Sequence, residues 1–255
     1  MGQSYFIWQG IDCRTKGIVM QGPAPIIIPE ERVKHIEIPG KPGDVTMIET
    51  RNEGEAAYNS YIQTVRFAVE GAENAKDVAR WLRWSGYVTF STDPNKKQPA
   101  RVIGAVTLNK HSYNHEWYEG EVQFYCQPFK ELLSDNPVKI YDNSHPLLWK
   151  VTNNGDVWAR PLIKMTTSST SPWICFTRSA GASRRINIDM TGLSNQVIYI
   201  DCETMEVYNS DKTTILTSRA TVTSQKFWPL LYLGEHDVTG DGWSEVEITK
   251  RERFL

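Results

Sequence analysis

The stretch that decides the fold of the first half of this chain lies at residues 61–86, which read YIQTVRFAVEGAENAKDVARWLRWSG. Its first nine residues alternate in character, the period-two pattern of a strand buried on one face. The more apolar face, which includes one amide, carries Tyr61, Gln63, Val65, Phe67 and Val69. The opposite face carries Ile62, Thr64, Arg66 and Ala68. The stretch therefore predicts a long strand with its inner face against a core.

The second part of the stretch changes to a helical period. Its apolar residues recur at i, i+3, i+4 and i+7, which places them in one stripe: Ala75, Val78, Ala79 and Leu82. Asn74 is a candidate N-cap and Gly86 a candidate C-terminal cap. We expect a helix over residues 75–85 that covers one face of the sheet, the one clear helix in the chain.

Upstream of this stretch, the sequence predicts an extended arm. Residues 22–29 read GPAPIIIP, and three prolines in eight residues exclude a central strand because proline cannot donate to a sheet ladder. The three adjacent isoleucines, Ile26, Ile27 and Ile28, then have no regular element to bury them. Such an arm either packs on its own domain or covers a neighbouring subunit, so these residues are candidates for an oligomer interface.

Downstream, the chain divides at a turn-rich break, Ser134-Asp135-Asn136-Pro137. We predict a first domain over residues 1–133, a β-sheet or split-barrel domain with one helix, and a second over residues 134–255. The second domain shows no helical period, and its predicted strands are 138–141, 147–151, 161–165, 173–177, 186–190, 197–201, 206–208 and 246–249. Short strands separated by turn signals predict a β-sandwich of the jelly-roll type, so the chain as a whole is expected to be mainly β.

Composition limits the possible functions. Hydrophobic residues make up 40% and charged residues 23% of the 255 residues, which are globular proportions. The net charge of −2 offers no basic face, so we expect no tight nucleic-acid binding. No apolar run approaches the roughly 18 residues that a membrane span needs, and the start lacks the pattern of a signal peptide. The protein is therefore expected to be made and used without export.

The cysteines point away from redox or zinc chemistry. Cys13, Cys126, Cys175 and Cys202 lie far apart in the sequence, so no C-x-x-C motif is present. Each sits among apolar or strand-like neighbours. We expect reduced, buried and inert thiols in a cytoplasmic protein.

Two further patterns have a spacing that metal binding could use. His111 and His115 are four residues apart, but they lie between predicted strands and no glutamate follows the first histidine, so a polar loop is expected. Residues 237–242, DVTGDG, look faintly like a calcium loop, but the twelfth position is Ile248 instead of glutamate. We interpret Asp241-Gly242 as a hairpin turn.

One pair of acids has a spacing that catalysis could use. Asp201 and Glu203 lie on one face of a strand, and the carboxylates of glycosidases are about 5–9 Å apart. The sequence shows no cleft and no third partner, so strand-end carboxylates are expected. Motifs for an activated nucleophile, a phosphate loop or a dinucleotide site are not found. We expect no enzyme activity, no catalytic residue, no metal and no cofactor.

Several short motifs occur in a characteristic order along the chain. They are residues 33–43 with their PGKPG turn, 127–130 (QPFK), 154–155 with 160–164, 197–201 with 206–208, 227–230 with 233–235, and 246–249 with Arg251 and Arg253. Together they resemble the distal tail (Dit) proteins of siphophages over nearly the whole length. Leu233 stands where that family often has proline, and His236 where it often has asparagine.

The resemblance implies a structural role in the virion. Six copies would form a homohexameric ring through their first domains, and the second domain, a galectin-like sandwich, would project outward. The ring would connect the tail-tube protein to the tail-tip or tail-associated protein, with receptor-binding proteins as further partners. It would be assembled in the host bacterial cytoplasm and become part of the tail tip or baseplate.

Two alternatives remain open from the residues. The second half is rich in tryptophan, at positions 149, 158, 173, 228 and 243, and exposed tryptophans on one sheet are typical of a carbohydrate-binding module for host-wall attachment. Core packing explains the same residues more simply. A wall-degrading enzyme would need a cleft with paired acids.

Overall fold

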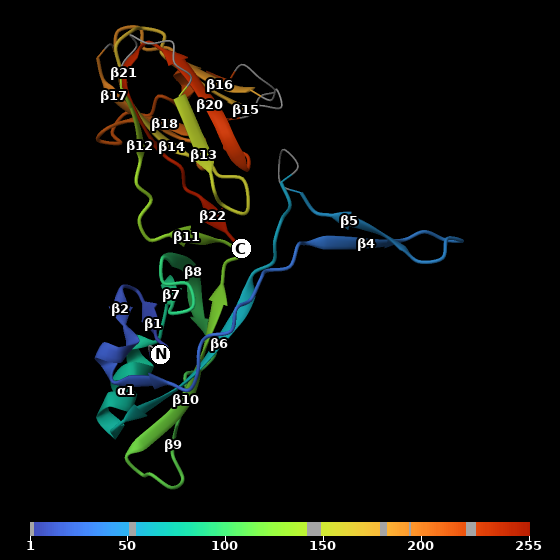
Figure 1. The fold of residues 1–255 in the computed structure, drawn as a ribbon, viewed down its shortest axis with the longest axis vertical. Helices are drawn as coiled ribbons and strands as arrows, with labels where there is room; N and C mark the ends of the chain where they lie inside the picture. The colour runs from blue at the N-terminus through green and yellow to red at the C-terminus, as the bar shows by residue number, and fades with distance from the viewer. Residues whose placement is uncertain (1–2, 51–54, 142–148, 179–182, 194, 223–227) are drawn as a thin grey trace. The chain divides into compact units, whose positions relative to one another are not determined.

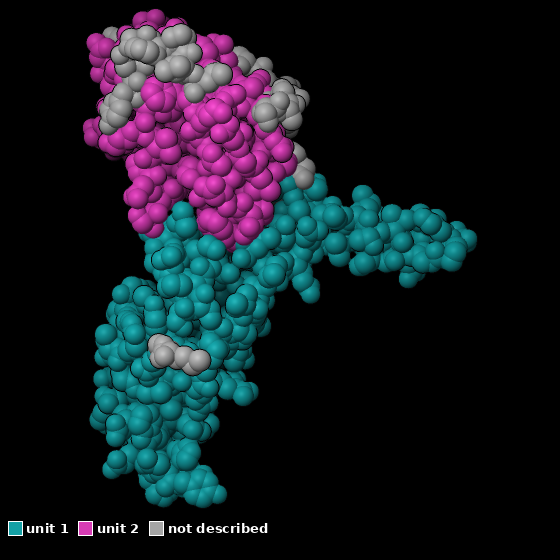
Figure 2. Space-filling model, viewed as in Figure 1, with its two compact units in different colours: residues 1–133, 255 teal, residues 134–254 magenta. Residues whose placement is uncertain are grey.

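The computed structural model of the chain describes residues 3–50, 55–141, 149–178, 183–193, 195–222 and 228–255 (Figure 1). The chain forms two compact units, residues 1–133 with Leu255, and residues 134–254 (Figure 2). The described elements are strands with a single α-helix and short 3₁₀ turns, which confirms a mainly β fold. In the described residues, no helix has both the length and the apolar character needed to cross a membrane.

Unit 1 is built on one antiparallel sheet with the strand order β2-β1-β7-β8-β10-β6-β3. The strands of this path are β1 (Phe6–Trp8), β2 (Ile11–Asp12), β3 (Ile18–Met20), β6 (Tyr61–Glu70), β7 (Ser85–Phe90), β8 (Lys96–Ile103) and β10 (Trp117–Cys126). Two short strands lie off this path: β9 (Leu108–Lys110) pairs with β10, and β11 (Lys130–Leu132) pairs with β8. A 3₁₀ turn, Cys13–Lys16, follows β2.

The long strand predicted at residues 61–69 is β6, and its alternation is confirmed. The inner residues Gln63, Val65, Phe67 and Val69 are all buried, and Ile62 and Arg66 on the other face are exposed. β6 pairs with β10 in a continuous antiparallel register from Tyr61–Cys126 to Glu70–Trp117. The inner face meets a core of aromatic and aliphatic residues, among them Phe6, Trp8, Val122 and Phe124.

The predicted helix exists, but both of its predicted ends are wrong. α1 spans Ala72–Trp81 instead of residues 75–85. It starts directly after β6 because Gly71, at φ +85°, makes the sharp turn that a residue with a side chain would resist. Asn74 is not the N-cap, since its amide donates to the Glu70 carbonyl at 2.9 Å, and Gly86 is not the C-terminal cap, since it lies in β7.

The apolar stripe of the helix is confirmed. Ala75, Val78 and Leu82, the last just beyond the helix end, are 5% exposed or less. They belong to the same buried cluster as Phe67 and Phe124 of the sheet. The helix therefore covers the inner face of the sheet.

Unit 1 also contains a hairpin that belongs to no larger sheet. Among the described residues, β4 (Val33–Glu37) and β5 (Asp44–Ile48) pair only with each other, in the register Val33–Ile48 to Glu37–Asp44. The PGKPG turn at residues 39–43 lies between them. In Figure 1 the hairpin extends away from the other strands of its unit.

Unit 2 is a sandwich of two five-stranded sheets. One has the order β12-β21-β14-β17-β18: Val138–Tyr141, Trp243–Thr249, Leu162–Thr167, Val197–Asp201 and Glu206–Asn209. The other has the order β13-β20-β15-β16-β19: Trp149–Asn153, Gly234–Asp241, Trp173–Arg178, Ser183–Ile188 and Ala220–Val222. The chain ends with a short strand, β22 (Arg253–Phe254).

The two sheets of unit 2 share one core, which confirms the predicted β-sandwich. Ile163 and Met165 of one sheet and Ile174 and Phe176 of the other are 0–1% exposed and form part of a single cluster. The start of the strand predicted at 147–151 lies outside the described residues, as does Phe227 of the family motif.

Two strand predictions in unit 2 need correction. β20 and β19 were not expected. The glycines and aspartates of β20 favour turns when only local signals are used, and β19 has only three residues, too few for a clear alternation. The hairpin predicted at Asp241-Gly242 is wrong, since β20 and β21 lie in different sheets. Gly242 instead makes a corner at φ +81°, where a Cβ would lie 2.3 Å from the Ser169 hydroxyl and 2.8 Å from Pro172.

The buried stripe of the helix gives a prediction for unit 1. Leu82→Asp should lower the free energy of unfolding of unit 1 by about 4 kcal/mol or more, because it places an unpaired charge in the core. Lys76→Ala, on the exposed face, is the control and should cost less than about 0.5 kcal/mol. Hydrogen exchange in increasing urea measures this effect on peptides of unit 1. Equal effects of both variants would contradict the prediction.

Candidate functional site

The two histidines with metal-like spacing lie in the loop between β9 and β10, as expected. The Nδ1 atom of His111 accepts the backbone N–H groups of Tyr113 and Asn114 at 3.2 and 3.1 Å, so this ring organises the loop. His115 is exposed. Throughout the described part of the chain, no three histidine, cysteine, aspartate or glutamate side chains gather as a metal site requires.

The acidic pair Asp201 and Glu203 is engaged with arginines. Asp201, at the end of β17, accepts two hydrogen bonds from the Arg251 guanidinium, at 2.7 and 3.0 Å. Burial would raise the pKa of Asp201, but the hydrogen bonds and charge of Arg251 outweigh it and hold the pKa below its usual value. Glu203 forms an ion pair with Arg253. Both carboxylates are thus engaged by arginines of the C-terminal segment and fasten that segment to the sandwich.

The cysteines are buried and unpaired, as predicted for inert thiols. Burial raises the pKa of the Cys126 thiol to about 12 and also raises the pKa of Cys13 and of Cys202. Because the thiolate is the reactive form, these three side chains are poor nucleophiles at neutral pH.

The tryptophans of unit 2 do not form an exposed platform in the residues that the structure describes. Trp243 is 2% exposed, and Trp149, Trp158, Trp173 and Trp228 are half-buried. The Arg185 guanidinium lies 3.9 Å from the centre of the Trp173 ring and occupies the face that a sugar would stack on. Core packing and ring contacts account for these residues.

The predicted arm is the most unusual surface of unit 1. Ile26 is 78% exposed and Ile28 is 71% exposed, whereas Ile27 is half-buried. The arm is held at both ends, by buried Ala24 and by buried Pro29. Two large aliphatic side chains therefore face solvent from a fixed extended segment, which is typical of an interaction surface.

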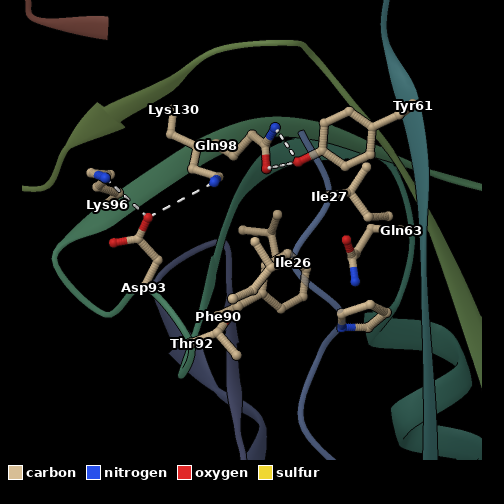
Figure 3. A pocket seen from close by; sticks show the side chains of 12 residues that line it. Ile26, Ile27, Tyr61, Gln63, Phe90, Thr92, Asp93, Lys96, Gln98 and Lys130 are labelled. Carbon is tan, nitrogen blue, oxygen red and sulfur yellow. Dashed lines mark hydrogen bonds and ion pairs between the residues drawn. The ribbon is translucent and has the colours of Figure 1, made fainter. Parts of the chain in front are cut away.

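Beneath the arm lies a small cavity of about 80 Å³ (Figure 3). Pro25, Ile26 and Ile27 of the arm form part of its wall. Its volume is well below the roughly 300–1,000 Å³ of sites that take small organic ligands. The cavity is better explained as the place where the arm rests on the sheet than as a ligand site.

The rest of the cavity is lined mostly by polar side chains, together with Val88 and Phe90. Gln98 donates to the Tyr61 hydroxyl at 2.9 Å and to the Gln127 carbonyl at 2.6 Å, and burial raises the pKa of Tyr61 to about 12 (Figure 3). Asp93 forms ion pairs with Lys96 and Lys130, at 3.2 and 3.9 Å. These contacts fix the ends of β6, β8 and β11 under the arm.

The β4–β5 hairpin is a second uncovered surface, which the sequence signals did not identify as such. One of its faces carries Ile36 and Val45 paired across the strands, and on the same face Met47, which is 53% exposed, lies opposite Lys34. Ile48, on the other face, is 50% exposed. The hairpin therefore presents apolar side chains that nothing in its own unit covers.

Trp84 is a third exposed apolar group. It lies between α1 and β7, is 74% exposed, and has a φ of +69°, which is unusual for a bulky residue. Its carbonyl accepts the N–H of Val102 at 3.0 Å, which helps to hold this conformation. No sequence pattern distinguished Trp84 from the buried tryptophans.

The Asp201–Arg251 pair gives a pH prediction. Since the pKa of Asp201 is lowered in the folded state, its stabilising effect is complete above the unfolded pKa of about 4 and is lost as the pH falls through the lower folded value. Asp201→Asn should therefore lower the unfolding free energy of unit 2 by about 2 kcal/mol at pH 7, with the difference from wild type shrinking below about pH 4. Exposed Asp211→Asn is the control. Urea unfolding between pH 2 and 7 measures both, and a constant difference would contradict the prediction.

Comparison with known proteins supports one fold. No family model matches the chain, and no curated protein matches its sequence. Among solved structures, the chain is similar to the SPP1 Dit protein, described as a paradigm of the hub adsorption apparatus in phages that infect Gram-positive bacteria. The TM-score is 0.72 at 15% sequence identity, and the match covers 100% of both chains. The chain therefore has the fold of a Dit protein over its whole length.

Proposed function

We propose that this protein is a structural hub of a phage tail tip or baseplate. It forms a homohexameric ring that connects the tail-tube protein to the tail-tip protein and to the adsorption apparatus, including receptor-binding proteins. The observation that carries the proposal is the full-length similarity to the SPP1 Dit protein, whose described role is that of a hub. This role needs no catalytic residue and no cofactor.

The uncovered surfaces of unit 1 support assembly. A two-stranded hairpin is at best marginally stable in water unless it packs on something else. The β4–β5 hairpin pairs with no other strand and leaves apolar side chains such as Met47 and Ile48 exposed. A neighbouring subunit would supply the missing layer.

The two surfaces also suit a ring. The arm at Ile26–Ile28 and the hairpin are different patches of the same unit, and each has exposed apolar side chains. When one patch contacts a different patch on the next copy, the interface is head-to-tail, and such interfaces close into rings when the rotation permits. We therefore assign Ile26, Ile27 and Ile28 to the ring interface.

The charge balance is compatible with a channel that DNA passes through. The net charge is −2, and on the outer face of the β6–β10 pair Arg66 lies 3.7 Å from Glu121. Opposite charges that neutralise one another hold a phosphate backbone less tightly than a basic groove does.

The proposal predicts the oligomeric state. The purified protein should form hexamers at high concentration, seen as six-fold rings by negative-stain microscopy. The double variant Ile26→Asp/Ile28→Asp should remain folded, because both side chains are exposed, but should shift the light-scattering mass toward the monomer. Ile215→Asp, 60% exposed in unit 2, is the matched control and should assemble normally. A monomer at every concentration would overturn the hexamer.

A further inference from the structure

The backbone of the arm is unpaired. In the described residues, residues 23–29 neither donate nor accept a backbone hydrogen bond, although flanking residues do: Gln21 donates to Arg66 at 3.0 Å, and Asn59 donates to Glu30 at 2.8 Å. Ile26, Ile27 and Ile28 each carry an N–H group, and the carbonyls of the segment are equally free. A row of unpaired backbone groups in an extended segment is a template for an added strand.

The arm is also preorganised for such pairing. Proline at positions 23, 25 and 29 fixes φ near −65° and keeps the preceding residues extended. Buried Ala24 and Pro29 hold the segment on the sheet. Binding a strand here would therefore cost little additional ordering of this chain.

We propose that residues 26–28 accept a β-strand from a second copy of this chain, and that this strand is an edge of the β4–β5 hairpin. The inference deepens the proposed ring, on which it rests, by naming the mode of contact. It is an addition of strand to strand, with isoleucines packed on the neighbour, and not side-chain contact alone.

The same chain offers a suitable partner strand. Because β4 and β5 pair only with each other, each keeps an outer edge of backbone groups that belongs to no sheet. One face of the hairpin carries Ile36, Val45 and Met47 beside Lys34. Residues 22–29 carry no charged side chain, so pairing with the hairpin rests on backbone hydrogen bonds and on its apolar side chains instead of on ion pairs.

Hydrogen exchange of the full chain tests the proposal. In the monomer, at low concentration, the amides of residues 26–28 should exchange quickly because they have no partner. Successive N–H groups of an extended segment point to opposite edges, so the added strand protects either Ile27 or the pair Ile26 and Ile28. In the isolated hexamer the amides of that edge should exchange more slowly, on the order of tenfold or more, together with amides of β4 or β5. Hexamers that form while residues 26–28 still exchange at the monomer rate would overturn the added strand and leave the proposed hub intact.

Two substitutions separate backbone pairing from side-chain packing. The proline variant is made on the edge that is protected in the hexamer: Ile27→Pro when the Ile27 amide is protected, and Ile26→Pro when the amides of Ile26 and Ile28 are. It removes one N–H that is unpaired in the monomer, and the alanine variant at the same position removes most of the side chain but keeps the N–H. Association, measured by mass photometry, should weaken on the order of tenfold more for the proline variant than for the alanine variant. Circular dichroism of both monomers should match wild type. Equal weakening by the two variants would overturn the proposal. Slowed exchange at residues 26–28 without slowed exchange in the hairpin would also overturn it, because the added strand would then come from another part of the chain. Failure of the wild-type chain to form any oligomer would overturn both this inference and the proposed ring.

Discussion

The pairing of β6 with β10 is the interaction on which unit 1 depends. Ten residues face ten in unbroken register, so Val65 lies opposite Val122 and both point into the core. A slip by one residue would turn Arg66 and Glu121 inward, which explains why this register is strongly specified. The other elements follow from it. β3 and β8 add to its two sides, the helix leaves β6 through Gly71, and the arm begins where Gln21 bonds to Arg66.

Sequence reasoning recovered what local periodicity determines and missed what distant contacts determine. The alternation of β6 and the apolar stripe of the helix depend only on residues close together in the sequence, so both were predicted. The helix start was missed because Gly71 permits a turn that bypasses Asn74. β20 was missed because it is held as a strand by pairing with β13 and β15, which are distant in the sequence. The Asp241-Gly242 turn was misassigned as a hairpin because a turn signal does not show which sheet the next strand joins.

The arm could be predicted from local sequence, whereas the hairpin surface and the partners of the acid pair could not. Prolines around Ile26–Ile28 marked the arm, because proline has a strong local effect on pairing. The uncovered hairpin could not be read from its residues, since an alternating strand looks the same whether or not a layer covers it. The partners of Asp201 and Glu203 lie 50 residues away in the sequence, so local spacing could not show that Arg251 and Arg253 engage these two acids.

The hairpin has a consequence for how this protein can vary. It begins and ends near a bridge between Glu31 and Tyr58, and it contributes no residue to the buried cluster of its unit. The residues that build the core and the exposed apolar residues of the hairpin therefore lie in physically separate parts of one domain. Substitutions can change the surface of the hairpin without changing the core of the unit.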